Sequence, residues 1–263
     1  MRGPVAGLML CAVMGGSMAH AQVIDPSQYE RLLLPVLMAR TPGMFGSEWL
    51  SSFVVYNGAD TPAAFYPIDC QLSVCPADEA FYIPPGTAGT PTTYFAAPGQ
   101  APGVLFYVKN DVFPRVSFAL RVKDLSRQGQ AEGTEITVVR ESRVRTGKMQ
   151  LLDVPTDGRF RVALRVYDLD ATGESAVVAR IFDQGLGSLL AQREMSLPVG
   201  QMATPPTRPG YAQILDLAQA FPQLASHAKV RVEIEPLTFG LRYWAYISVA
   251  NNDTQFVTTI TEQ

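Results

Sequence analysis

The chain has 263 residues, a formal net charge of −3 and hydrophobic residues at 47% of its positions. This balance suits one or two folded globular domains, and the slight acidity gives no global attraction for nucleic acid. We therefore expect no nucleic-acid partner. The one local run of basic residues contains Arg140, Arg143, Arg145 and Lys148. Glu141 interrupts this run, which is typical of a solvated surface.

Residues 1–21 have the pattern of a secretory signal peptide. Arg2 precedes an uncharged apolar run, and Ala19-His20-Ala21 matches a small-residue cleavage site. We therefore expect cleavage before Gln22 and a secreted or periplasmic protein. No later segment approaches 18 consecutive apolar residues, so we expect no membrane span once the signal is removed.

Two cysteines follow the predicted signal, Cys70 and Cys75, in the segment CQLSVC. In an oxidising compartment such a close pair most simply forms a disulfide bond. The alternative is a zinc site, but a Cys2His2 set needs two histidines and His227 is the only one after the signal. The sequence therefore predicts a Cys70–Cys75 disulfide.

One sequence pattern occurs twice in the chain. The segments WLSSFVVYN (49–57) and FRVALRVYD (160–168) match at Trp49/Phe160, Phe53/Leu164, Val55/Val166 and Tyr56/Tyr167. Flanking segments match in the same order, including Phe118-Ala119 with Trp244-Ala245. The sequence therefore predicts an internal duplication, with one copy over residues 22–142 and the second over 146–263.

Within each copy, hydrophobic residues alternate with polar ones. In the second copy Val162, Leu164 and Val166 fall on one side of a strand, and Arg161 and Arg165 fall on the other. This period of two predicts strands with one buried and one solvent-exposed face. Clusters of proline and glycine separate about seven such strands in each copy, the number typical of an immunoglobulin-like sandwich.

The predicted fold is therefore all-β, with two tandem immunoglobulin-like β-sandwich domains. Residues 214–228 form the one segment with a helical pattern. Pro222 should stop or kink this helix, because proline lacks the amide hydrogen that a helix needs.

The segment RVYDLDATGE (165–174) raises the question of a metal site. Asp168 and Asp170 occupy the first and third positions of a calcium-loop pattern, but Ala179 stands where the pattern needs a bidentate acid. In the first copy Asn57 replaces Asp168. Both copies share the composition of a tight turn that leaves a strand. We expect such a turn and no cofactor, with Asp168 and Asp170 as weak calcium candidates.

Enzymatic motifs are sparse in this sequence. A Ser-His-Asp mechanism needs a histidine base, and His227 is the only candidate, in a loop before a strand. The G-x-S-x-G segment that would present a nucleophile does not occur. Acids from distant strands could still meet in a sandwich, so a carboxylate-based hydrolase stays open as an alternative to a non-enzymatic protein.

Four aromatic residues are candidates for stacking on sugar rings: Trp49, Tyr243, Trp244 and Tyr246. The two tryptophans stand at apolar positions that the repeat makes equivalent, which favours core packing. We expect one of the two tyrosines to be exposed to solvent. We expect the protein to bind a protein or glycan that the sequence does not identify.

The segment FVVYNGADTPAAFYPID (53–69) resembles the strand–turn–strand segments of bacterial immunoglobulin-like modules. The resemblance implies a binding, adhesion or structural role in the cell envelope or the extracellular space. Asn57 and Pro62 also match the spacing of the first domain of periplasmic chaperones for pilus-type subunits. The P-P-x-E-S motif of that family is absent, however, where IPPGTAGTP (83–91) stands.

Overall fold

The computed structural model describes residues 26–66, 80–90, 103–129, 132–170, 174–198 and 208–262. Within these ranges strands are the dominant secondary structure, and α1 is the one α-helix, which confirms the predicted all-β class. The expected signal peptide and the expected disulfide of Cys70 and Cys75 lie outside the described residues. Across the described part of the chain, no helix has the length and hydrophobicity that a membrane crossing requires.

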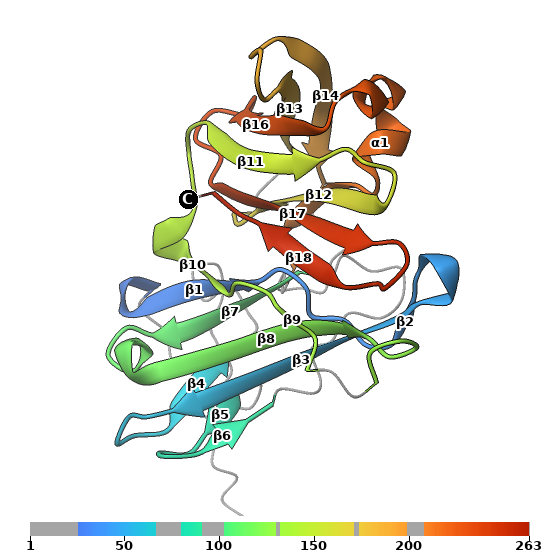
Figure 1. The fold of residues 1–263 in the computed structure, drawn as a ribbon. Helices are drawn as coiled ribbons and strands as arrows, with labels where there is room; N and C mark the ends of the chain where they lie inside the picture. Colours follow the sequence, from blue (N-terminus) through green and yellow to red (C-terminus); the bar gives the residue numbers. More distant parts are fainter. Residues whose placement is uncertain are drawn as a thin grey trace, which may run out of the picture.

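The strands up to residue 140 form two antiparallel sheets, which we call the first half (Figure 1). One sheet has the order β10-β1-β7-β4-β5, and the other has the order β2-β3-β8-β9 with β6 also beside β3. The strands are β1 (Tyr29–Leu34), β2 (Thr41–Pro42), β3 (Glu48–Asn57), β4 (Ala63–Tyr66), β5 (Phe81–Ile83), β6 (Ala88–Gly89), β7 (Val104–Lys109), β8 (Val116–Asp124), β9 (Thr134–Glu135) and β10 (Val139–Arg140).

The strands from residue 149 onward form two further antiparallel sheets, the second half. Their orders are β11-β16-β13-β14 and β15-β12-β17-β18, and the second of these lies toward the first half in Figure 1. The strands are β11 (Met149–Pro155), β12 (Phe160–Asp168), β13 (Ser175–Asp183), β14 (Leu189–Leu197), β15 (Gly210–Ile214), β16 (Lys229–Pro236), β17 (Tyr243–Asn251) and β18 (Val257–Ile260).

The predicted helix over 214–228 is shorter than expected. Helix α1 covers Leu217–Ala220 and begins at Asp216, whose carboxylate accepts a hydrogen bond from the amide of Ala218. Pro222 then starts a 3-10 segment, Pro222–Ser226. The remaining 3-10 turns are Pro26–Gln28, Met44–Gly46, Phe113–Arg115 and Glu141–Arg143.

The two halves share one strand order. Without β10 and β2, the sheets of the first half read β1-β7-β4-β5 and β6-β3-β8-β9, which correspond to β11-β16-β13-β14 and β15-β12-β17-β18. An internal duplication predicts this correspondence. The immunoglobulin-like order is not confirmed, because that fold places its first two strands side by side in one sheet. Here β1 pairs with β7, and β3 lies in the other sheet.

The strand register corrects one predicted match between the copies. Val55 pairs with Phe118 in the first half, and its counterpart Val166 pairs with Ala245 in the second. Phe118 therefore corresponds to Ala245 and not to Trp244. A slip of one residue moves a side chain to the opposite face of a sheet. Trp244 thus lies on the outer face of β17, away from the core of its own half.

The outer faces of equivalent strands have different environments in the two halves. On β3 this face is exposed, with Val54 at 41% and Tyr56 at 47%. On β12 the first half covers it: Ala163 is 5% exposed and Tyr167 is 0% exposed. The Tyr167 hydroxyl donates a hydrogen bond of 2.6 Å to the carbonyl oxygen of Pro35. The predicted exposed face is therefore right for β3 and wrong for β12.

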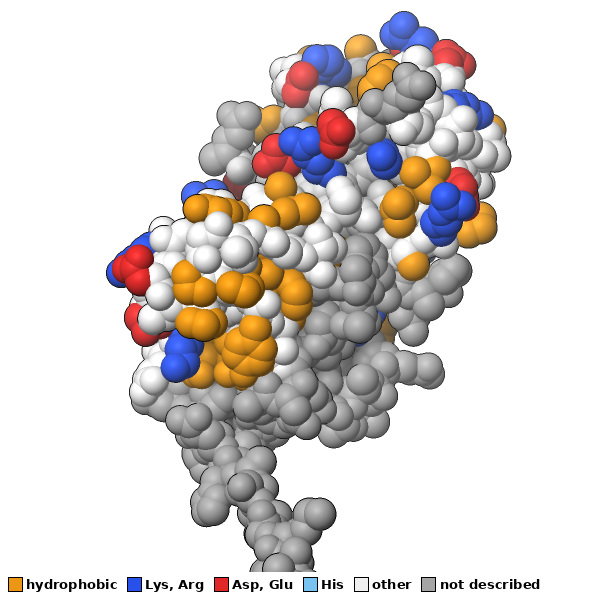
Figure 2. Space-filling model, turned by 90° about the horizontal axis from the view of Figure 1, so that it is seen from below, with side chains coloured by type: hydrophobic (Ala, Val, Ile, Leu, Met, Phe, Trp, Pro, Cys, Tyr) orange, Lys and Arg blue, Asp and Glu red, His pale blue; other side chains and the backbone are white. Residues whose placement is uncertain are grey.

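Hydrophobic side chains also gather on the surface that Figure 2 shows from below, with basic and acidic side chains interspersed around them. The large hydrophobic side chains that β3 and β5 expose are Val54, Tyr56 and Tyr82. The outer face of β3 is thus apolar and open, whereas its counterpart on β12 is enclosed.

The inward faces of β3 and β12 support a testable prediction. Phe53 and Leu164 occupy matching positions and are 1% and 0% exposed, as the repeat predicts. Replacing either by alanine leaves a cavity, so we expect each variant to lose about 2–4 kcal/mol of unfolding free energy. Urea denaturation measures this loss. The neighbouring Val54→Ala change, on the exposed face, is the control and should cost far less. Near-neutral values for both core variants would contradict the assigned faces.

A candidate ligand cavity between the two halves

A cavity of about 360 Å³ lies between the two halves. The first half contributes Val36, Met38 and Trp49 to its wall, and the second half contributes Arg161 and Arg165. Most of the wall is apolar. Small-molecule sites in proteins typically have volumes of about 300–1,000 Å³ and combine apolar walls with a few polar groups. The cavity thus has the size and lining of a site for a small ligand.

The alternation of β12 and β17 places the polar groups of this cavity. Arg161, Ala163 and Arg165 share one face of β12 because they are two residues apart. Tyr246 pairs with Arg165 on β17, and Ser248 pairs with Ala163. The small side chains of Ala163 and Ser248 stand between the two arginines and leave the space open.

Arg165 is held in place at the wall of the cavity. Its Nη1 donates a hydrogen bond of 2.6 Å to the Ser248 hydroxyl. Its guanidinium also lies 5.7 Å from the centre of the Tyr246 ring, within the range of a cation–π contact. Burial raises the pKa of Tyr246, so this hydroxyl stays protonated at neutral pH. Arg165 therefore presents a fixed positive charge.

The guanidinium of Arg161 has fewer and weaker hydrogen bonds than that of Arg165. Its Nη2 reaches the Gln255 side-chain oxygen at 3.5 Å, the outer limit of a hydrogen bond, and its Nη1 is shielded from solvent with no acceptor. Burial lowers the pKa of Arg161; the negative charge of Asp216 opposes this effect, and the positive charge of Arg165 adds to it. Within the described residues, neither arginine has a carboxylate within 4.0 Å. A buried donor without an acceptor costs free energy.

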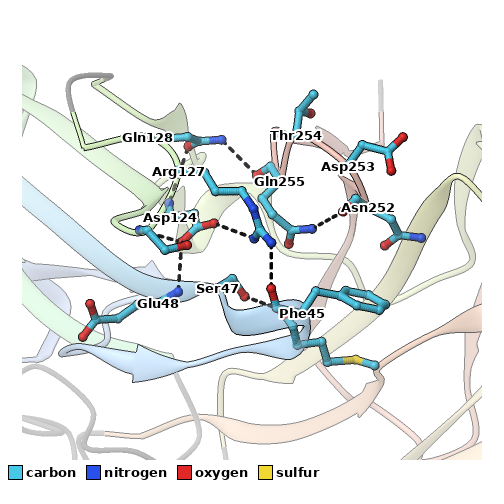
Figure 3. A network of polar contacts seen from close by, with 12 residues as sticks. Phe45, Ser47, Glu48, Asp124, Arg127, Gln128, Asn252, Asp253, Thr254 and Gln255 are labelled. Atoms are coloured by element: carbon cyan, nitrogen blue, oxygen red, sulfur yellow. Dashed lines mark hydrogen bonds and ion pairs between the residues drawn. The ribbon is translucent and has the colours of Figure 1, made fainter.

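A polar network holds the first-half loop beside the cavity (Figure 3). Its centre is the fully buried Asp124 carboxylate, which accepts from the Glu48 amide at 2.9 Å and from the Ser126 hydroxyl at 2.7 Å. Arg127 contacts Asp124 at 3.4 Å and donates to the Phe45 carbonyl oxygen at 2.7 Å. Phe45 has a φ of +56°, a conformation that non-glycine residues rarely adopt. The network thus stabilises a strained loop next to the cavity.

The same network reaches the second half. Gln128, which follows Asp124 by one turn, donates from its side chain to the Gln255 carbonyl oxygen at 2.9 Å. Gln255 is fully buried, and its side chain donates to the Asn252 carbonyl oxygen at 2.7 Å (Figure 3). These bonds fix the turn between β17 and β18, which also carries the weak acceptor of Arg161. Both halves are therefore tied together at this edge of the cavity.

Four charged residues form a second connection, which we call the junction ion cluster: Arg31, Glu141, Asp170 and Arg242. Arg31 contacts Glu141 and Asp170 at 2.7 Å each, and Arg242 contacts the same two acids at 2.6 and 2.5 Å. Arg31 is 2% exposed and also donates to the Leu169 carbonyl oxygen. The cluster joins β1, the connecting segment and the second half, and its charges balance.

The predicted turn after the repeated strand is present in both halves. The Asn57 side chain accepts a hydrogen bond from the Ala59 amide at 2.9 Å, and the Asp168 carboxylate accepts from the Asp170 amide at 2.9 Å. A side chain that bonds the amide two residues later defines an Asx turn. The second Asp168 oxygen accepts from the Ser175 hydroxyl. Asn57 and Asp168 thus perform the same structural task.

The two calcium candidates, Asp168 and Asp170, both have other partners in the structure. Asp170 is occupied by two arginines in the junction ion cluster, and Asp168 is 3% exposed within its turn. Across the part of the chain that the structure describes, no group of three or more His, Cys, Asp or Glu residues could hold a metal ion.

The structure also places the candidate aromatic residues. Trp49 lines the cavity, whereas Tyr243 and Tyr246 are 0% and 1% exposed, so neither tyrosine offers an open stacking surface. Trp244 stacks on Tyr246 with ring centres 5.1 Å apart. Sequence reasoning missed this grouping because it treated the outer face of the second repeat as solvent-exposed.

The basic run and the lone histidine pair with acidic residues outside the cavity. Within the basic run, the structure pairs Arg140 with Glu30, Arg145 with Glu262 and Lys148 with Glu233. His227 Nδ1 lies 2.7 Å from the Asp183 carboxylate, a pairing that the sequence did not indicate. This pair joins the turn after β13 to the segment before β16, and neither residue lines the cavity.

Comparison with protein-family models, with curated proteins and with solved structures finds no match to this chain. The assignment of a role therefore depends on the geometry described above. That geometry defines an all-β protein of two similar halves, with a cavity of about 360 Å³ between them.

Asp124 gives a pH-dependent prediction. Burial opposes its ionisation, but hydrogen bonds from Ser126 and from the Glu48 amide outweigh this effect and lower the pKa of Asp124. A lowered pKa stabilises the fold above the unfolded value of about 3.9, and this contribution is lost as pH falls through the folded value. We expect Asp124→Ala to lose about 1–3 kcal/mol at pH 7. Urea denaturation measures the unfolding free energies of the variant and the natural protein at both pH values. Their difference should be smaller in acid than at pH 7.

The control for this experiment is Asp253→Ala, because Asp253 is exposed in the turn that Figure 3 shows. Its unfolding free energy should match that of the natural protein at both pH values. A loss at Asp124 that is equally large in acid would contradict the ionised network.

Calcium binding gives a separate prediction. Because the Asp170 carboxylate already contacts Arg31 and Arg242, calcium would have to displace two cations. We expect calorimetry to detect no calcium binding below about millimolar concentration, the weak end for extracellular calcium modules. Micromolar binding that Asp168→Ala and Asp170→Ala together abolish would overturn the assignment of these residues to a turn.

Proposed function

We propose that the chain is an exported, non-enzymatic binding protein of the cell envelope or the extracellular space, and that its ligand occupies the cavity between the halves. One observation carries this proposal: two arginines line an apolar cavity of ligand size, with no carboxylate within 4.0 Å among the described residues. A positive site of this kind selects a ligand through its charge.

Export is supported by the signal pattern of residues 1–21 and by the close pair Cys70 and Cys75. The shared strand order supports an internal duplication, in which two copies of one module form a cavity that neither copy encloses by itself. Cavities between domains are frequent ligand sites.

The chemistry of the cavity favours binding over turnover. An arginine keeps its proton at any physiological pH, and burial raises the pKa of Tyr246, so these groups orient a ligand but do not exchange protons with it. General acid–base catalysis needs a group that titrates near the working pH. His227 is the only histidine after the predicted signal, and it lies outside the cavity.

Native mass spectrometry of the mature protein, purified from the envelope of its natural host, tests this proposal. We expect a non-covalent small-molecule adduct that denaturation releases. Ala163→Phe, which fills the cavity from β12, should abolish the adduct. Val54→Phe introduces the same side chain on an exposed face and should retain the adduct.

Two controls keep this result interpretable. Thermal melting must show that Ala163→Phe folds, and Ser248→Leu provides a second way to fill the cavity. The released molecule must also remain chemically unchanged after incubation with fresh protein. Conversion to a product would favour the hydrolase alternative, and an adduct that both cavity variants retain would place the binding site elsewhere.

A further inference from the structure

We infer that the ligand of the cavity is a small apolar carboxylate, with its head group paired to Arg161 and its body against the apolar wall. This inference rests on the proposed binding function and specifies its ligand class. It depends on three features of the cavity, namely two arginines without a directly contacting carboxylate, the unused hydrogen-bonding capacity of Arg161 and the hydrophobic lining.

The charge of the cavity calls for an anion. Arg31, the buried arginine at the junction, contacts two carboxylates in the junction ion cluster. Arg161 and Arg165 differ from it, because no acid lies within 4.0 Å of either among the described residues. Both arginines are half-buried, and partial removal of a cation from water without a contacting counter-ion is costly, the more so for two neighbouring cations. A bound anion would remove this penalty, whereas a cation would increase it and a neutral ligand would leave it.

The geometry of Arg161 favours a carboxylate among the possible anions. Its Nη1 has no acceptor, and its Nη2 makes one contact at 3.5 Å with Gln255. These two nitrogens form one edge of the planar guanidinium, which matches the two oxygens of a carboxylate. Ser248 and Tyr246 engage Arg165 instead. Arg161 is therefore the primary partner, and Arg165 contributes a supporting charge.

The rest of the wall indicates the chemistry of the ligand outside its head group. Met38, Trp49 and Val122 provide a continuous apolar surface, and Met44 lies at its margin with 52% of its surface exposed. Methionine side chains adapt to ligands of irregular shape because they are unbranched and polarisable. A compact hydrocarbon body fits this surface, while a sugar would leave most of its hydroxyl groups without partners.

Decanoate is a suitable probe, with decanol as its uncharged counterpart and acetate as an anion without an apolar body. We expect calorimetry on the mature protein to show binding of decanoate, weaker binding of decanol and no measurable binding of acetate. Decanoate should also change the tryptophan fluorescence, and Trp49→Phe should reduce this change because Trp49 lines the cavity.

Arg161→Gln isolates the ion pair. Because a hydrogen bond to a charged group is worth more than a neutral one, this change should weaken decanoate binding about 10- to 100-fold and leave decanol binding unchanged. The matched control is Arg159→Gln, since Arg159 lies two residues away, is exposed and pairs with Asp157. Arg161→Lys keeps the charge but lacks the planar fork, so we expect an intermediate affinity.

Several outcomes would overturn the inference. The natural protein could bind decanoate and decanol with equal affinity, or it could fail to bind decanoate. Arg161→Gln could also bind decanoate with full affinity. If Arg161→Gln does not fold, the comparison of decanoate with decanol on the natural protein still decides the result. A neutral or cationic native adduct that Ala163→Phe abolishes would reject the carboxylate while the proposed binding function stands.

Discussion

The junction ion cluster is the interaction on which the arrangement of the molecule depends. Arg31 comes from the first strand, Glu141 from the connecting segment, and Asp170 and Arg242 from the second half. Each arginine contacts both acids, so a rotation of one half would separate several charge pairs at once. Removal of a single partner would leave an uncompensated buried charge, which is far more costly than the loss of an exposed ion pair. The cluster therefore fixes one orientation of the halves.

This fixed orientation creates the cavity. The face of β12 that carries Arg161 and Arg165 would be solvent-exposed in an isolated sandwich, and the first half encloses it. The network around Asp124 ties down the opposite wall, including the loop at Phe45. Ser248 and Tyr246 hold Arg165 in this partly apolar space. For the proposed ligand, such preorganisation would lower the entropy cost of binding.

The two halves show how one strand order can serve different purposes. Their sheets correspond strand for strand, yet the outer face of β3 is open while that of β12 is covered. The difference lies in a few side chains at matching positions. Val54 corresponds to Arg165. Tyr56 and Tyr167 are the same residue at matching positions, but Tyr56 is exposed, whereas the Tyr167 hydroxyl donates to the Pro35 carbonyl oxygen.

The sequence by itself determined the all-β class, the inward faces at Phe53 and Leu164, and the turns at Asn57 and Asp168. These features follow from the period of two and from side chains that bond their own backbone, both of which are local. Only the tertiary structure decided the strand order, the one-residue shift of Trp244 and the cavity. Alternation shows which residues share a face of a strand, but the partner that covers this face comes from a distant segment, through contacts that no local pattern encodes.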